Sequence, residues 1–226
     1  MKVGVLYSGG KDSTLALLRA KKSHEISCLI TIYPKKEDSY MFHFPNIKLV
    51  ELQAKAMEIP LISRETAGEK EKELKDLEKA VKEAVKKYGI EGVVTGAVKS
   101  AYQKTRIEKL CKKLKLSCFN PLWQEDEIQI IKDVLKNKLE VIITMVASYP
   151  FTKDFLGKKI DEELISVLLS FKEKFGTSLL GEGGEFETLV LDAPFFKKRL
   201  KIGEYKISYE NFRGMFLIKS AELVDK

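Results

Sequence analysis

Residues 2–18 read KVGVLYSGGKDSTLALL, and this stretch decides the fold. The apolar run 2–7 predicts a buried strand, and residues 13–22 predict an amphipathic helix. The two glycines between them can adopt left-handed backbone angles and let a ligand approach the main chain. Because the unpaired amides of a helix N-terminus attract anions, residues 8–13 are predicted to bind phosphate. The residues assigned to this site are Ser8, Gly9, Gly10, Lys11, Asp12 and Ser13.

The loop differs from a Walker A motif, whose pattern is G-x-x-x-x-G-K-[ST]. Asp12 follows Lys11 where that motif has Ser or Thr, and Val5 stands where it has its first glycine. An acid beside a phosphate calls for either a Mg²⁺ ion or a tight turn, so Asp12 is the candidate metal ligand. A simple Gly-Gly turn between a strand and a helix is the alternative interpretation.

Apolar runs and helical patterns alternate up to about residue 148. The predicted strands after the first are 27–33, 61–66, 92–96, a short piece near 118, and 140–146. The predicted helices are 46–57 with Asn46 as its cap, 69–88, 99–114 and 125–136. This alternation predicts an α/β fold with a doubly wound, mostly parallel, Rossmann-like sheet. Such sheets bind ligands at the carboxyl ends of their strands, where residues 8–13 lie.

The pattern changes after about residue 148. A turn-rich passage leads into a predicted helix at 161–175, closed by Gly176, and the glycine-rich stretch 181–194 (GEGGEFETLVLDAP) is followed by further apolar strands. This order predicts a smaller α+β unit packed on the first. The expected division is therefore a phosphate-binding domain at 1–148 and a smaller substrate-binding domain at 149–226 that carries GEGGEFET.

Forty Lys and Arg against 33 Asp and Glu leave a net charge of +7, which favours anionic partners such as nucleotides. The charges are interleaved rather than massed, as along 69–88, a predicted solvated helix. The apolar stripe of that helix is Leu74, Leu77, Val81, Val85 and Tyr88. The charge pattern is typical of a soluble surface, and we expect no stable nucleic-acid partner.

The three cysteines, Cys28, Cys111 and Cys118, form no C-x-x-C pair, and the two histidines complete no zinc ligand set. No apolar run approaches the roughly 18 residues needed to span a membrane, and the N-terminus does not resemble a signal peptide. We therefore expect a reducing cytoplasm and no membrane partner. Cys111 lies on the apolar stripe of its helix and is expected in the core. The oligomeric state, including a homo-oligomer, stays open.

The hexapeptide SGGKDS (8–13) resembles the PP-loop of the N-type ATP pyrophosphatases. That resemblance implies an adenine nucleotide alpha hydrolase-like fold in which ATP is cleaved between its α- and β-phosphates. Segments 38–44 (DSYMFHF), 95–116 (TGAVKSAYQKTRIEKLCKKLKL), 121–123 (PLW) and 181–194 then resemble, in this order, the diphthine–ammonia ligase (diphthamide synthase) family. The chain departs from the family pattern at Ala97, where relatives usually have Asp, and at Leu180, where they often have Cys.

The family resemblance implies an ATP-dependent, AMP-forming amide ligase with ATP and Mg²⁺ as cofactors. Its partners would be ammonium and elongation factor 2 bearing diphthine, a modified histidine. ATP would adenylate the diphthine carboxylate, pyrophosphate would leave, and ammonia would displace AMP to give diphthamide. The implied catalytic residues are Lys11 and the loop amides, for the leaving pyrophosphate, with Asp12, and Glu185 as a base or as the ligand of the incoming ammonium.

The remaining site residues come from three segments and from the end of one strand. Gly96, at the end of strand 92–96, is assigned to the ATP site. The substrate-binding candidates are Tyr40, His43, Lys99, Tyr102, Gln103, Arg106, Glu182, Glu185 and Glu187. Aromatic side chains and carboxylates suit diphthine because it carries a trimethylammonium group. Each group also has a plain interpretation: a small hydrophobic cluster at 40–43, a solvated first turn at 99–106, and an acidic turn at 182–187.

Two other functions fit parts of the sequence. A PP-loop enzyme that modifies tRNA suits the positive charge, but the chain lacks a basic-aromatic patch and an exposed cysteine for sulfur transfer. A non-catalytic ATP-binding module would share the same fold. The intact loop residues Ser8, Lys11 and Asp12, together with the acidic stretch 182–187, favour an enzyme over a sensor.

Overall fold

The computed structural model describes residues 1–34, 46–66 and 70–226, with side chains omitted at 70–72. Its first sheet has the strand order β3-β2-β1-β4-β5, and every neighbouring pair is parallel. The strands are β1 (Lys2–Leu6), β2 (Glu25–Pro34), β3 (Leu61–Thr66), β4 (Gly92–Val94) and β5 (Ser117–Phe119). The predicted α/β fold with a parallel sheet is therefore confirmed.

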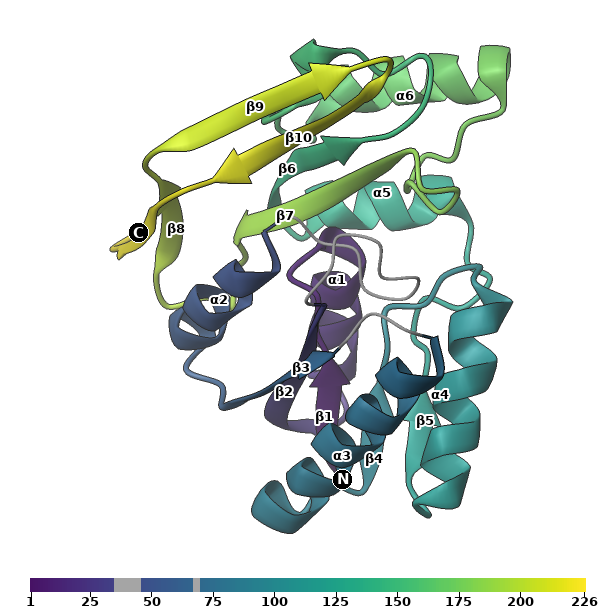
Figure 1. Cartoon of the computed structure of the whole chain (residues 1–226), viewed down its shortest axis with the longest axis vertical. Coiled ribbons are helices and arrows are strands. Elements are labelled where there is room, and N and C mark those ends of the chain that lie inside the picture. The colour runs from purple at the N-terminus through teal and green to yellow at the C-terminus, as the bar shows by residue number, and fades with distance from the viewer. Residues whose placement is uncertain (35–45, 67–69) are drawn as a thin grey trace.

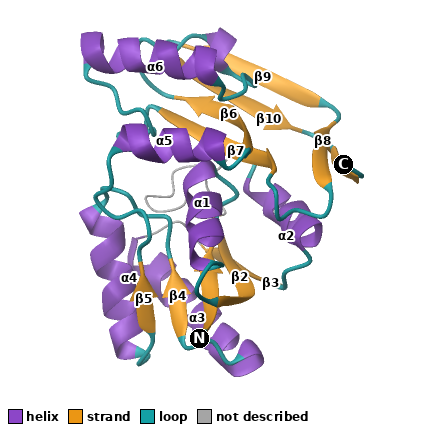
Figure 2. Cartoon of the chain, turned by 180° about the vertical axis from the view of Figure 1, so that it is seen from behind, coloured by secondary structure: helices purple, strands orange, loops and turns teal. Residues whose placement is uncertain are grey.

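Helices cover both faces of this sheet, as a doubly wound fold requires (Figures 1 and 2). The described helices are α1 (Lys11–Ala20), α2 (Val50–Met57), α3 (Lys70–Tyr88), α4 (Ala101–Lys113), α5 (Glu127–Lys136) and α6 (Glu162–Phe175), with short 3-10 turns at Ile47–Leu49 and Lys153–Phe155. Of these, α6 lies apart from the parallel sheet, beside the strands of the second sheet (Figure 1). Buried residues of α3 and α4 form one core cluster, and those of α1, α2 and α5 belong to the other. Because β2 and β4 flank β1, the chain reverses direction across the sheet there, and this is where such folds bind ligands.

A second, antiparallel sheet has the order β7-β6-β10-β9, and β8 pairs with β11 beside it. The strands are β6 (Glu140–Val146), β7 (Phe186–Asp192), β8 (Arg199–Ile202), β9 (Tyr205–Glu210), β10 (Arg213–Ile218) and β11 (Ala221–Val224). The larger core cluster runs through both sheets, from Val3 and Val5 of β1 to Ile143 of β6 and Val190 of β7. The C-terminal strands therefore share one core with the parallel sheet.

The placement of β6 differs from expectation. The sequence grouped 140–146 with the parallel strands, but β6 pairs antiparallel with β7 and β10. A continuous apolar run reports burial and carries no information about strand direction, which depends on partners about 45 residues further along the chain. The domain division at residue 148 stays a prediction. β6 precedes that position but pairs with strands that follow it.

Asn46 also has a different role from the predicted helix cap. Its side chain makes no capping bond, because a 3-10 turn precedes α2. The amide instead donates from Nδ2 to the Phe216 carbonyl (2.9 Å) and accepts from the Ile218 N–H at Oδ1 (2.9 Å). Asn46 thus holds the start of α2 against β10. In the described part of the chain, no helix is long and apolar enough to cross a membrane.

Candidate functional site

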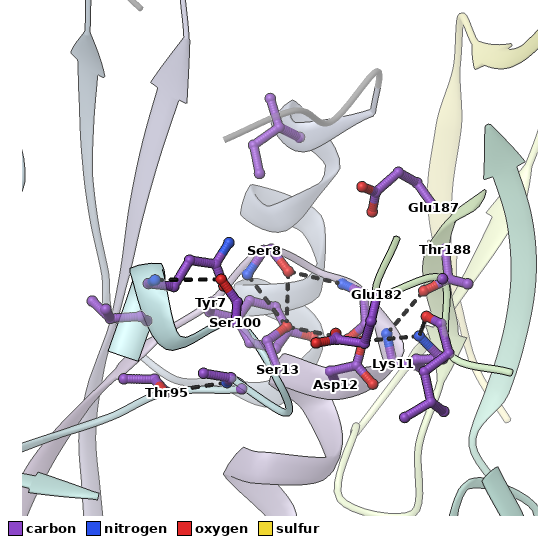
Figure 3. A pocket seen from close by; sticks show the side chains of 18 of the residues that line it. Tyr7, Ser8, Lys11, Asp12, Ser13, Thr95, Ser100, Glu182, Glu187 and Thr188 are labelled. Carbon is purple, nitrogen blue, oxygen red and sulfur yellow. Dashed lines mark hydrogen bonds and ion pairs between the residues drawn. The ribbon is translucent and has the colours of Figure 1, made fainter. Parts of the chain in front are cut away.

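A cavity of about 540 Å³ opens at the carboxyl edge of the parallel sheet, between the loop after β1 and the turn before β7 (Figure 3). Both structural units line it, since β7 belongs to the antiparallel sheet. Most of the predicted site residues lie here: Ser8, Gly10, Lys11, Asp12, Ser13, Gly96, Tyr102, Gln103, Glu182 and Glu187. Gly9, Lys99, Arg106 and Glu185 do not line it. Tyr40 and His43 lie outside the described residues.

The loop after β1 is built to leave backbone amides for a ligand. Gly9 adopts φ +83°, which turns the chain from the strand into α1, and Gly10 caps α1 without a side-chain bond. The hydroxyls of Ser8 and Ser13 lie 3.1 Å apart, and Ser13 Oγ donates to the Gly10 carbonyl (3.1 Å). Since the first N–H groups of a helix have no partner within it, the geometry of this loop fits the predicted anion site.

Gly96 supports the loop from β4. A Cβ on Gly96 would lie 2.8 Å from the Ser13 nitrogen and 2.9 Å from the Asp12 carbonyl carbon. Both are backbone atoms, so the contact cannot be relieved by a rotating side chain. Glycine is therefore required at the end of β4 for the loop to pack against it.

The side chain of Lys11 extends from the loop after β1 to the C-terminal unit. The side chain is 2 % exposed, and Nζ donates to Asp12 Oδ2 (2.8 Å) and to the Leu180 carbonyl. Nζ also lies 5.5 Å from the centre of the Phe186 ring, within cation–π range. The backbone N–H of Lys11 donates to Thr188 Oγ1 (3.2 Å), a residue of β7. The positive charge is thus fixed at the junction of the two units.

The two carboxylate oxygens of Asp12 differ in their hydrogen bonding. Oδ2 accepts the Lys11 ammonium, whereas Oδ1 is buried and accepts no hydrogen bond from the described residues. An orphaned carboxylate oxygen beside an anion site fits a Mg²⁺ ion that arrives with phosphates. Across the described chain, no three His, Cys, Asp or Glu side chains converge as a metal site. The donor set therefore fits a cation held mostly by phosphate oxygens and water.

The turn before β7 and the start of β7 bring two acids to the cavity, Glu182 and Glu187. Glu182 lies over Asp12 and Lys11 (Figure 3), and its Oε2 accepts the Lys99 N–H (2.9 Å). Loss of solvation, followed by the negative charge of Asp12, raises the pKa of Glu182. Loss of solvation raises the pKa of Glu187 to about 8, a direction that Asp12 and Glu182 reinforce and Lys11 opposes. Glu187 can therefore hold or release a proton near neutral pH.

Glu185 holds the turn together instead of facing the cavity. Its Oε1 accepts the Ser178 N–H (2.8 Å) and its Oε2 accepts the Gly183 N–H (2.9 Å). Both oxygens are thus bound to the backbone of the loop 177–185. The catalytic assignment of Glu185 stays a prediction, and of the two acids flanking Phe186 it is Glu187 that lines the cavity.

The start of α4 contributes Tyr102 and Gln103 to the cavity wall. Ser100 caps the helix by accepting the Gln103 N–H at Oγ (3.3 Å), which directs the first turn toward the cavity. Lys99 turns away and donates Nζ to Glu127 Oε1 (2.7 Å). The Arg106 guanidinium lies 4.0 Å from the centre of the Tyr102 ring, so it supports that ring from outside.

Three buried polar residues at the site were missed by the sequence analysis. Gln53, on the buried face of α2, donates Nε2 to the carbonyls of Gly9 (3.0 Å) and Val190 (2.7 Å). Thr188 receives the Lys11 N–H, and Glu127 at the start of α5 is 4 % exposed. A polar residue among the apolar positions of α2 was the available signal for Gln53. Nothing local distinguishes Glu127 from other acids in a first helical turn.

Comparison with known proteins assigns the whole chain to one family. A model of the diphthamide synthase N-terminal domain matches residues 1–118, and a model of the C-terminal domain matches residues 126–224. The chain belongs to the diphthamide synthase family. The resemblance seen in the sequence is thereby confirmed. The N-terminal family domain covers the parallel sheet and the C-terminal family domain covers the antiparallel one.

Curated relatives of this diphthamide synthase family member carry one name. Diphthine–ammonia ligase of Rattus norvegicus is 34 % identical over 222 residues, covering 89 % of this chain and 83 % of the relative. Diphthine–ammonia ligase of Schizosaccharomyces pombe is 34 % identical over 224 residues, covering 92 % of this chain but 37 % of the relative. Among solved structures, a predicted subunit of tRNA methyltransferase from Methanocaldococcus jannaschii has TM-score 0.41 and 16 % identity, covering 86 % of this chain and 98 % of that chain.

Proposed function

We propose that this chain is an ATP-dependent diphthine–ammonia ligase, which converts the diphthine of elongation factor 2 into diphthamide. One observation carries the proposal beyond family membership: a single cavity joins an anion-binding helix N-terminus to the acids Glu182 and Glu187. The first half suits the phosphates of ATP, and the second suits a cationic acceptor and ammonium. A site with both halves can activate a carboxylate and then amidate it.

In the first step, a carboxylate oxygen of diphthine attacks the α-phosphorus of ATP, and the bond between that phosphorus and the bridging oxygen to the β-phosphate breaks. Pyrophosphate leaves with the electron pair of that bond. The amides of the loop 8–13 and the Lys11 ammonium stabilise its charge, because they are already in place before the reaction. Asp12 would hold Mg²⁺ through Oδ1, and the ion would neutralise phosphate charge.

In the second step, ammonia attacks the acyl carbon and AMP leaves as the phosphate anion. Ammonium must first lose a proton, and the ionised fraction of a carboxyl group whose pKa is about 8 can accept it near neutral pH. Glu187 lines the cavity and fits this role, while Glu182 attracts the cation. Glu185 contributes by fixing the turn that carries Glu182 and leads into the strand with Glu187.

The test is a reconstituted reaction containing the protein, ATP, Mg²⁺, ammonium and elongation factor 2 bearing diphthine. We expect one AMP and one pyrophosphate per acceptor, together with the mass change of a carboxyl group becoming an amide. Lys11→Met is expected to slow product formation by at least about 100-fold, the usual effect of removing a preorganised charge donor. Lys22→Met, an exposed lysine just after α1, is the matched control and is expected to be active.

Other outcomes separate the competing functions. AMP release that requires tRNA, with no amide formed, would show a tRNA-modifying enzyme and reject the proposal. ATP binding without AMP release under any of these conditions would show a binding module.

A further inference from the structure

Glu127 is a buried carboxylate that receives donors from three separate parts of the chain. Its side chain is 5 % exposed. Lys99 Nζ, before α4, donates to Oε1 (2.7 Å), and Lys172 Nζ of α6 donates to Oε2 (2.6 Å). The loop after α6 adds Ser178 Oγ to Oε1 (3.2 Å) and the Leu179 N–H to Oε2 (3.3 Å). A buried ionised group with four donors is a junction of the fold rather than a surface ion pair.

One chain of hydrogen bonds leads from Glu127 to the phosphate loop. Ser178 Oγ, which donates to Glu127, also accepts the N–H groups of Leu180 (3.1 Å) and Glu182 (3.2 Å). The carbonyl of Leu180 in turn accepts Lys11 Nζ. Each link fixes the next, so the position of the Lys11 ammonium depends on a loop that is anchored at Glu127.

A second chain leads from Glu127 to the acids of the cavity. Lys99 is bound at its side chain by Glu127, and its backbone N–H is bound by Glu182 Oε2 (2.9 Å). Lys99 therefore connects Glu127, through its side chain, to Glu182, through its backbone N–H. Its two bonds explain why this predicted substrate ligand lies outside the cavity lining.

We propose that Glu127 is a positioning residue for the ligase reaction, which sets the Lys11 ammonium and the acidic turn 180–187 in register with each other. The expected effect on the reaction rate rests on the proposed function. The expected effect on the position of the turn rests on the hydrogen bonds alone. Glu127 touches neither substrate nor reacting atoms, since it does not line the cavity. Its contribution is geometric: a displacement on the order of 1 Å of catalytic groups can cost about 100-fold in rate.

The test compares Glu127→Gln with Glu127→Asp and with Glu140→Gln. Gln keeps the size of the side chain but removes the charge that holds two ammonium groups, whereas Asp keeps the charge. Glu140 pairs with Arg199 (3.1 Å) at the far end of β6 from the turn, so Glu140→Gln removes a carboxylate charge and its ion pair away from the cavity. Two readouts are used: kinetics of amide formation, and amide hydrogen exchange of residues 178–185 in the ligand-free protein.

For Glu127→Gln we expect kcat to fall by roughly 10- to 100-fold, while KM for ATP changes less than about threefold. Exchange at residues 178–185 should accelerate at least about tenfold, with the parallel sheet unchanged. Glu127→Asp should recover part of kcat, and Glu140→Gln should match the wild type in both readouts. Wild-type kcat in Glu127→Gln, or acceleration spread evenly over the whole chain, would overturn the proposal.

Failure of the proposed function gives a different result. A wild-type protein that forms no amide rejects the ligase, yet the exchange measurement still decides whether Glu127 anchors the turn. Unchanged exchange at residues 178–185 in Glu127→Gln would reject the anchoring role whatever reaction the cavity performs.

Discussion

Glu187 and Glu185 differ by two positions and have opposite surroundings. Glu185 accepts two backbone N–H groups, whereas Glu187 faces the cavity and no described residue forms a hydrogen bond or ion pair with its carboxylate. Strand geometry alone does not explain this, because residues two apart point to the same side of a strand. The difference arises because Glu185 precedes β7, in the turn, and Glu187 lies within the strand.

The raised pKa of Glu187 predicts a pH dependence of stability. Its carboxyl keeps a proton up to about pH 8 in the folded chain, against an ordinary value of 4.5. Between these values the folded state binds more protons, so the free energy of unfolding contributed by this group falls as pH rises, by at most about 1.4 kcal/mol per pH unit. Urea unfolding of the ligand-free protein from pH 5 to 9 measures it.

Glu187→Gln should flatten that slope because the amide does not titrate. Glu173→Gln, at an exposed position of α6, is the control and should keep the wild-type slope. Equal slopes in the Glu187→Gln variant and the wild type would contradict the prediction.

At the scale of elements, α3 shows how a sequence stripe becomes a packed face. The predicted stripe is rotated slightly from the observed one, because Val81 is 1 % exposed and Val85 is 37 % exposed. Ala80 and Ala84 are fully buried in its place, against β2 and β3. Small residues let the helix approach the sheet closely, which a count of large apolar residues overlooks.

Substituting the two valines tests this packed face. Val81→Ala should lower the free energy of unfolding by about 1–3 kcal/mol, from lost burial and the cavity it leaves. Val85→Ala removes the same atoms from a more exposed position, and alanine favours helices, so its effect should stay within about 0.5 kcal/mol. Chemical denaturation of both variants measures the difference, and equal losses would show that the stripe is packed as the sequence alone suggested.

At the scale of the whole molecule, the two sheets are joined through one core and a few buried amides. Gln53 links the phosphate loop to β7, and Asn46 links the start of α2 to β10. Each bonds main-chain groups that are distant from it in sequence, and the Val190 N–H adds a direct bond to the Gly9 carbonyl (2.9 Å).

Asn46→Ala should therefore destabilise the entire fold. It leaves the Phe216 carbonyl and the Ile218 N–H without their partner, at a cost of about 2–4 kcal/mol. Asn137→Ala removes a local bond to the Asp133 carbonyl within one helix end and should cost about 1 kcal/mol. Urea unfolding followed by circular dichroism and by Trp123 fluorescence should show one coincident transition for Asn46→Ala. A second transition, or a loss no greater than that of Asn137→Ala, would show that the sheets are not coupled through Asn46.

The sequence by itself determined the α/β fold, the parallel sheet and the position of the phosphate loop. These follow from local patterns: an apolar strand, a glycine pair and a helix start within residues 2–18. The family was also visible, because its motifs are contiguous stretches. Even the helix ends at Asp161 and Gly176 were readable, since capping depends on one or two residues.

Only the tertiary structure decided which groups meet. The antiparallel pairing of β6, the bond from Lys11 to the Leu180 carbonyl, and the anchoring of the acidic turn by Glu127 join residues 40 to 169 positions apart. The apolar pattern of a strand indicates that its residues are buried but not which strand they pair with. A carboxylate that binds a substrate cannot be told in the sequence from one that binds a backbone amide. The predicted phosphate loop was therefore recognisable in the sequence, whereas the acids that line the cavity beside it became distinguishable only in the folded chain.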